Sequence, residues 1–182
     1  CETGLVGVPI DANTYIGPPA WYTADAPRDA SILVNYNGFP DEAVAAFNHA
    51  VDIWSVLIES NVVIRIDAMW EELGSGILAQ SGPSNLHQNF ANAPLEDTYY
   101  AAALANALAG DDLSEQSDIE CAFSSEANWY FGTDGMTPTG QYDFVTAALH
   151  EIAHGLGFIG SAYYTYGFGF IGTANIPYPY DH

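Results

Sequence analysis

Segment 143–157 constrains the fold more than any other part of this 182-residue chain. Its apolar residues recur at the spacing of one helix face, which predicts a buried stripe along an α-helix: Val145, Leu149, Ile152 and Leu156. Asp143 stands at the position of an N-cap. Gly155 and Gly157 lie near the other end, where a helix commonly ends at a glycine in the left-handed conformation. We therefore expect a helix from about 143 to about 157 with one face in the core.

The same segment contains the run His150-Glu151-Ile152-Ala153-His154. Residues four apart lie on the same face of a helix, so the two imidazoles can converge on one ion. The pattern is typical of zinc sites in which the intervening glutamate acts as general base without being a ligand. A solvated polar face could carry the same residues, but the apolar helix around them favours zinc. The sequence thus predicts His150 and His154 as metal ligands and Glu151 as the catalytic base.

The composition limits the partners of the chain. Two Lys or Arg residues stand against 23 Asp or Glu residues, which gives a formal net charge of −21. This charge repels phosphate backbones and anionic lipids, which excludes nucleic acid, and it attracts cations and basic peptides. The hydrophobic content of 49% indicates a packed core, and no apolar run is long enough to span a bilayer. A single domain over residues 1–182 is expected, and its acidity favours solubility.

The chain has two cysteines, Cys1 and Cys121. An even count in an exported protein predicts a disulfide, and we therefore expect a secreted, extracellular protein. A lipid-modified cysteine at position 1, or two buried free thiols, would explain the same residues.

The remaining patterns predict an α+β fold in which residues 1–30 form an irregular N-terminal arm. A turn at 37–40 should lead into a helix of about five turns that Asp41 caps. A strand over 119–123 should lie at the sheet edge beside a cleft. The other expected elements are strands at 31–36, 62–67 and 74–79, a loop at 81–94, a helix at 95–109, and an irregular aromatic tail from 161.

Five acidic residues before the predicted 119–123 strand could bind calcium, since hard cations prefer several carboxylates at short range. They lack the spacing of an EF-hand loop, so a solvated acidic loop is the alternative that we favour. The residues are Asp111, Asp112, Glu115, Asp118 and Glu120.

Several stretches resemble a family of secreted bacterial and fungal zincin-like metalloproteases, of metzincin type and similar in motif to leishmanolysin. They are HEIAHGLGF, NVVIRIDAMW, ALANALAGDD, WYFGTDG and the final PYPYDH. The resemblance implies a zincin-like fold, with a twisted mixed sheet, a long backing helix and the HExxH helix in the active site. It also implies an endopeptidase that binds a peptide or protein substrate along the sheet edge.

The chain departs from the metzincin pattern at the third zinc ligand, where it has Gly160. The resemblance then implies a later ligand, for which we expect Asp181, with His182 or a residue beyond this chain as alternatives. Met69 and Met136 precede the motif, whereas the family places its methionine after it, so the C-terminal subdomain is expected to be truncated. The alternative function is a catalytically incomplete scaffold that acts as a structural or self-assembling extracellular protein, as a homo-oligomer or filament. A calcium-dependent binding module is a third possibility.

Overall fold

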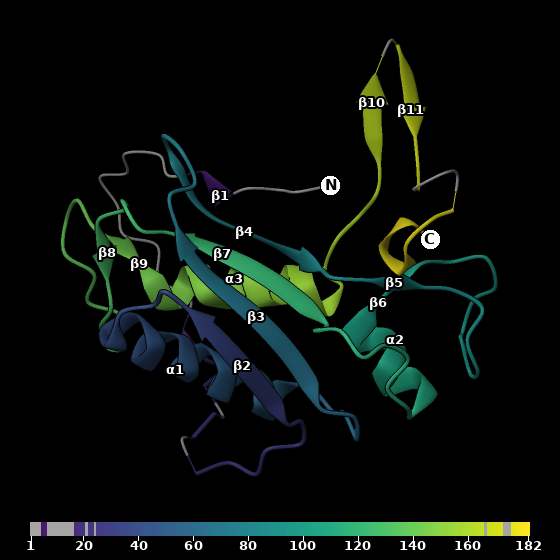
Figure 1. Cartoon of the computed structure of the whole chain (residues 1–182), viewed down its shortest axis with the longest axis horizontal. Coiled ribbons are helices and arrows are strands. Elements are labelled where there is room, and N and C mark those ends of the chain that lie inside the picture. Colours follow the sequence, from purple (N-terminus) through teal and green to yellow (C-terminus); the bar gives the residue numbers. More distant parts are fainter. Residues whose placement is uncertain (1–4, 7–16, 21, 24, 166, 173–175) are drawn as a thin grey trace.

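The computed structural model describes residues 5–6, 17–20, 22–23, 25–165, 167–172 and 176–182. Within these residues the protein has a mixed α+β fold with three α-helices and a mixed five-stranded sheet (Figure 1). The α+β class expected from the sequence is confirmed. No helix in the described part is both long and apolar enough to cross a membrane.

The main sheet has the strand order β1-β4-β7-β3-β2. Three strands run parallel: β2 (Ile32–Asn37), β3 (Ile64–Glu71) and β7 (Ile119–Ser124). β4 (Ile77–Pro83) pairs antiparallel with β7, and the two-residue β1 (Leu5–Val6) pairs antiparallel with β4. Part of the predicted N-terminal arm therefore joins the sheet.

The position predicted for strand 119–123 is wrong, because β7 lies in the middle of the sheet and not at its edge. Five of its six residues are buried, as is usual for a strand with neighbours on both sides. On that side of the sheet, β4 lies between β7 and the two-residue β1. β1 pairs there with only Ile77 and Ala79.

Helices α1 (Asp41–Leu57) and α3 (Phe144–Leu156) pack on one face of the sheet and against each other. Edge-to-face aromatic contacts fill the core between the helices and the sheet. For example, the ring centroids of Phe47 on α1 and Phe123 on β7 are 5.7 Å apart. Asp41 does not cap α1 as predicted. Pro40 occupies the N-cap, and Asp41 lies in the first turn, where its charge still favours the positive end of the helix dipole.

Helix α2 (Ala102–Ala109) is shorter than the predicted helix at 95–109, although it ends at left-handed Gly110 as expected. The two residues before α2 are extended because they form β6 (Tyr100–Ala101), which pairs with β5 (Leu86–His87), and residues 94–97 form bends and turns. β5 also interrupts the predicted loop at 81–94, whose first residues continue β4. Alanine propensity is weak compared with these tertiary contacts.

The tail is more regular than its sequence predicts. β10 (Tyr163–Thr165) and β11 (Phe168–Phe170) form an antiparallel hairpin that projects from the body, and a 3-10 turn spans Pro179–Asp181 (Figure 1). A parallel pair of short strands, β8 (Trp129–Tyr130) and β9 (Tyr142–Asp143), precedes α3.

Cys121 is a buried free cysteine in the structure, and Cys1 lies outside the described residues. The disulfide between them stays a prediction.

Candidate metal centre

The two histidines of α3 converge as the sequence predicts. Their Nε2 atoms are 2.9 Å apart, and their rings are edge-on with centroids 4.5 Å apart. Two nitrogens that share a tetrahedral zinc at bonds of about 2.0–2.1 Å lie about 3.3 Å apart. A small outward shift of either ring would therefore open a space that fits the ion, so this donor pair suits zinc.

The ring of His154 is held by a backbone contact just beyond the helix. Its Nδ1 lies 3.0 Å from the carbonyl oxygen of Phe158. Since a carbonyl only accepts, Nδ1 carries the proton and donates, which leaves the lone pair of Nε2 free for a metal. The sequence motif does not reveal this partner, because the contact depends on how the chain turns at Gly157, where φ is +109°.

His150 is exposed and His154 is partly exposed, so water can reach the pair. Partial loss of solvation around the ring, and after it the neighbouring imidazole of His154, lowers the pKa of His150 below its ordinary value. A lowered pKa keeps the ring neutral at physiological pH, which is the state that binds metal.

Glu151 is fully buried, and neither of its carboxylate oxygens has a hydrogen-bond partner among the described residues. Burial raises its pKa to about 8. An unpaired buried carboxyl costs stability, and such groups are concentrated at functional sites. A group with a pKa near neutrality can both take up and release a proton, as a general base requires.

The fold holds α3 in place at its N-terminus and near its middle. The carboxylate of Asp143 accepts a hydrogen bond from the backbone N–H of Thr146 at 2.8 Å, so the predicted N-cap is confirmed. The indole of Trp54 on α1 donates to the carbonyl of Leu149 at 3.1 Å. The predicted stripe is also confirmed: Val145, Ile152 and Leu156 are buried, and Leu149 is partly buried against the core.

The structure does not bring Asp181 to the histidine pair. Its carboxylate accepts hydrogen bonds from the backbone N–H groups of Ser161 and Tyr178 and from the hydroxyl of Ser161, which close the C-terminal turn. The alternative ligand, His182, contacts the hydroxyl of Thr98. In the described part of the chain no group of three or more His, Cys, Asp or Glu is placed to share a metal ion. Among the described residues, the candidate centre therefore consists of the two imidazoles.

The acidic stretch considered for calcium is engaged by the protein itself. Asp118 is buried and accepts hydrogen bonds from the N–H of Arg65 at 2.7 Å and from the amide of Asn106 at 2.8 Å. Asp112 forms an ion pair with Arg65 at 2.7 Å. These carboxylates tie the loop to β3 and α2, and calcium binding there stays a prediction.

Comparison with known families corrects the resemblance drawn from the motifs. A family model described as SPBPB7E8-like matches residues 95–166, a stretch that includes α3 and its histidines. This is not a metalloprotease family, and no metzincin family matches, so the assignment to leishmanolysin-like proteases is wrong. The HExxH run and the glycine at 157 were too short to identify a family. No match was found among curated proteins or solved structures.

Proposed function

We propose that this protein is a zinc-dependent endopeptidase that acts outside the cell. The observation that carries the proposal is the convergence of the His150 and His154 Nε2 atoms to 2.9 Å on the helix that also carries the buried carboxyl of Glu151, which has no partner among the described residues. Metal-assisted hydrolysis uses groups of this kind: imidazole ligands for the metal and a carboxyl of raised pKa that can move a proton. We further propose a zincin-like arrangement, in which α1 backs the sheet and α3 carries the site.

Zinc, when bound by the two imidazoles, supplies Lewis-acid chemistry that polarises a carbonyl and acidifies water. The residues of the chain move the proton and orient the ligands. Glu151 takes a proton from the water whose oxygen attacks the peptide carbonyl carbon. The same carboxyl then gives that proton to the amine that leaves as the C–N bond breaks. The Phe158 carbonyl keeps the ring of His154 in one tautomer throughout.

The outer edge of β4 supports a peptide as substrate. Beyond Ala79 its outer side has no strand partner among the described residues, and α3 packs directly against this strand. An extended peptide can add to such an edge through backbone hydrogen bonds. A substrate bound there would lie beside the helix that carries the histidines.

A Glu151→Gln variant tests the proposal, because the amide is nearly the same size and cannot accept the proton. We expect casein cleavage to fall by at least about 100-fold while zinc content is unchanged. Glu59→Gln, which changes an exposed glutamate just after the end of α1, should cleave as the parent does. Equal cleavage by the two variants would show that Glu151 is not the base.

The β10–β11 hairpin favours a second candidate, a self-assembling extracellular protein on a catalytically incomplete scaffold. Tyr163 stacks on Phe170, and Tyr164 and Phe168 are 76% and 67% exposed. Exposed aromatic side chains are enriched in protein interfaces. Light scattering distinguishes the two functions: a polymer that forms equally with and without chelator, and cleaves no peptide, would favour assembly.

A further inference from the structure

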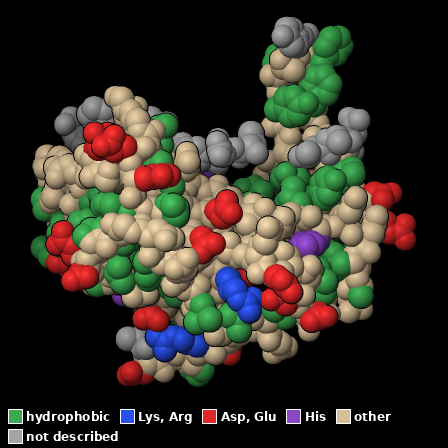
Figure 2. Space-filling view, in the orientation of Figure 1, with side chains coloured by type: hydrophobic (Ala, Val, Ile, Leu, Met, Phe, Trp, Pro, Cys, Tyr) green, Lys and Arg blue, Asp and Glu red, His purple; other side chains and the backbone are tan. Residues whose placement is uncertain are grey.

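The segment that carries the β10–β11 hairpin differs from the rest of the chain in its charge. Residues 152–180 contain no Asp, Glu, Lys or Arg, although the whole chain has 23 acidic and 2 basic residues. In Figure 2 acidic side chains are spread over the body of the molecule, whereas the projecting hairpin shows hydrophobic ones. The hairpin is therefore the part that can approach an uncharged phase without desolvating a charge.

Large hydrophobic side chains are exposed mainly in the same segment. An exposed apolar patch of this kind marks a site of contact with a partner or a membrane. Of the eleven exposed large hydrophobic side chains among the described residues, seven lie in 158–180: Phe158, Tyr163, Tyr164, Phe168, Phe170, Ile171 and Tyr180.

The hairpin exposes aromatic rings on both of its faces. The strand register places Tyr163, Phe168 and Phe170 on one face. Tyr164 points to the other face and is 76% exposed, while Phe168 is 67% exposed. A partner that docks on one face would leave the ring on the opposite face in water. An occupant that surrounds the hairpin covers both.

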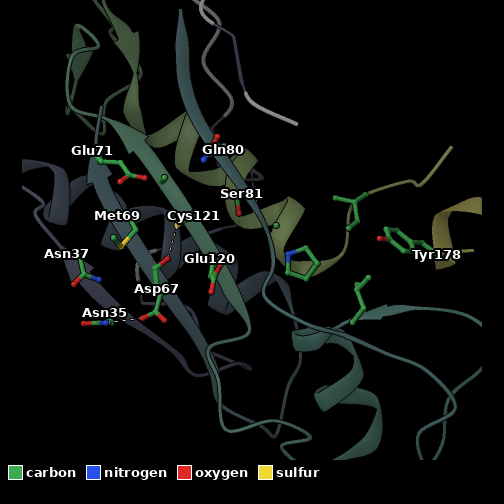
Figure 3. A pocket seen from close by; sticks show the side chains of 15 residues that line it. Asn35, Asn37, Asp67, Met69, Glu71, Gln80, Ser81, Glu120, Cys121 and Tyr178 are labelled. Atoms are coloured by element: carbon green, nitrogen blue, oxygen red, sulfur yellow. Dashed lines mark hydrogen bonds between the residues drawn. The ribbon is translucent and has the colours of Figure 1, made fainter. Parts of the chain in front are cut away.

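The hairpin projects from a fixed base. The hydroxyl of Ser161, before β10, accepts a hydrogen bond from the N–H of Gly172, after β11, at 2.7 Å. Tyr178, further along the tail, is only 8% exposed and lines one end of a cavity of about 620 Å³ (Figure 3). Asp67 and Glu120 line the other end of this cavity, so the body there carries charge. The base thus holds the aromatic rings away from the charged body (Figure 1).

A neutral lipid surface fits these features better than a protein partner does. Aromatic side chains favour the zone between head groups and acyl chains, where a Tyr ring is buried and its hydroxyl stays in contact with water. A fluid interface closes around an inserted hairpin, so it covers both faces. The net charge of −21 repels anionic head groups and leaves neutral ones as the favoured surface.

The backbone of the hairpin sets the depth of insertion. Among the described residues, β10 and β11 pair only with each other, so their outer edges keep unpaired N–H and C=O groups. Open sheet edges do not occur in the hydrocarbon core, where water cannot satisfy these groups. The hairpin should therefore stop at the hydrated level of the head groups.

We propose that the β10–β11 hairpin binds neutral lipid surfaces, with Tyr164 and Phe168 inserted among the head groups and the acidic body in water. This activity goes beyond the proposed peptidase and uses neither the histidine pair nor Glu151. The Glu151→Gln variant should accordingly bind lipid as the parent does, whether or not the parent cleaves casein.

Co-flotation of the full chain with phosphatidylcholine vesicles measures this binding. Tyr164→Ser/Phe168→Ser removes the two most exposed rings of the hairpin. Leu33→Ser/Met136→Ser removes two side chains of similar exposure from other parts of the surface, 59% and 74%. We expect the hairpin pair to weaken binding at least about tenfold and the control pair to change it less than about twofold, because affinity follows the apolar area that enters the interface.

The charge of the lipid provides a second readout. When about a third of the lipid is phosphatidylserine, binding of the parent should weaken, and added salt should restore it by screening the repulsion. Stronger binding to these anionic vesicles than to phosphatidylcholine would contradict the proposal.

Both pairs should fold, because the four side chains are exposed, and equal melting temperatures would confirm it. Absence of parent binding to phosphatidylcholine, or equal weakening by both pairs, would overturn the proposal. Light scattering without lipid tests a second copy of the chain as the occupant. A parent dimer that the hairpin pair abolishes, with no binding to vesicles, would assign the aromatic rings to self-association instead.

Discussion

Gly155 of α3 packs directly on the side chain of Ile119 in β7. A β-carbon at position 155 would lie 2.8 and 2.9 Å from Cγ1 and Cδ1 of Ile119, and closer still to Cγ2. Real β-carbons do not approach other carbons this closely, so only glycine permits the contact. Since His154 precedes this glycine, the approach of α3 to the sheet also fixes how far the two imidazoles lie from the sheet.

Gly155→Ala should therefore destabilise the protein despite the higher helix propensity of alanine. Overpacking of this kind costs about 1–3 kcal/mol, which urea denaturation measures. In an Ile119→Ala background the obstructing carbons are gone, and the same substitution should cost much less. An equal cost in both backgrounds would show that the contact is not the cause.

The helix predictions succeeded where local chemistry decides the structure. Asp143 and Gly157 delimit α3 as predicted because a cap and a left-handed glycine act within one turn of the chain. The predicted metal pair converges for the same reason, since a spacing of four residues is a property of the helix alone.

The predictions failed where contacts with segments distant in the sequence decide the structure. The central place of β7 depends on its pairing with both β3 and β4. Residues 95–101 do not form the predicted helix because Tyr100 and Ala101 pair with β5 and because the N–H of Tyr99 donates to the carbonyl of Pro177.

Burial of Glu151 should make stability depend on pH in the metal-free protein. In the unfolded chain this carboxyl loses its proton near its ordinary pKa of 4.5, whereas the folded protein holds it until about pH 8. The unfolded state therefore binds fewer protons between these values, so this group lowers the free energy of unfolding as pH rises from 5 to 8. Glu151→Gln cannot ionise and removes the effect.

Urea denaturation of parent and Glu151→Gln, in chelator at pH 5, 6.5 and 8, measures this contribution. The stability advantage of the variant should grow with pH by a few kcal/mol, on the order expected for a shift of several pKa units. Other titrating groups cancel in the difference, and Glu59→Gln should follow the parent at every pH. Parallel curves for parent and Glu151→Gln would mean that the carboxyl is not desolvated.

Asp181 should prove structural. Asp181→Ala removes the acceptor for the N–H groups of Ser161 and Tyr178, so amide hydrogen exchange at both residues should accelerate. Zinc content should stay at the parent level because the carboxylate is engaged in this turn. Asp181→Asn keeps one acceptor oxygen and should show slower exchange than the alanine variant. Loss of zinc in Asp181→Ala, with unchanged exchange, would instead make it a ligand.

The convergence of His150 and His154 on one ion is tested most directly by the zinc content of the purified chain. Emission spectrometry after dialysis should find one zinc per parent chain, and His150→Ala and His154→Ala should each lose it. His49→Ala, which removes a histidine on α1, should retain it. Zinc content that is the same in all four proteins would contradict the assignment of these two imidazoles as the metal centre.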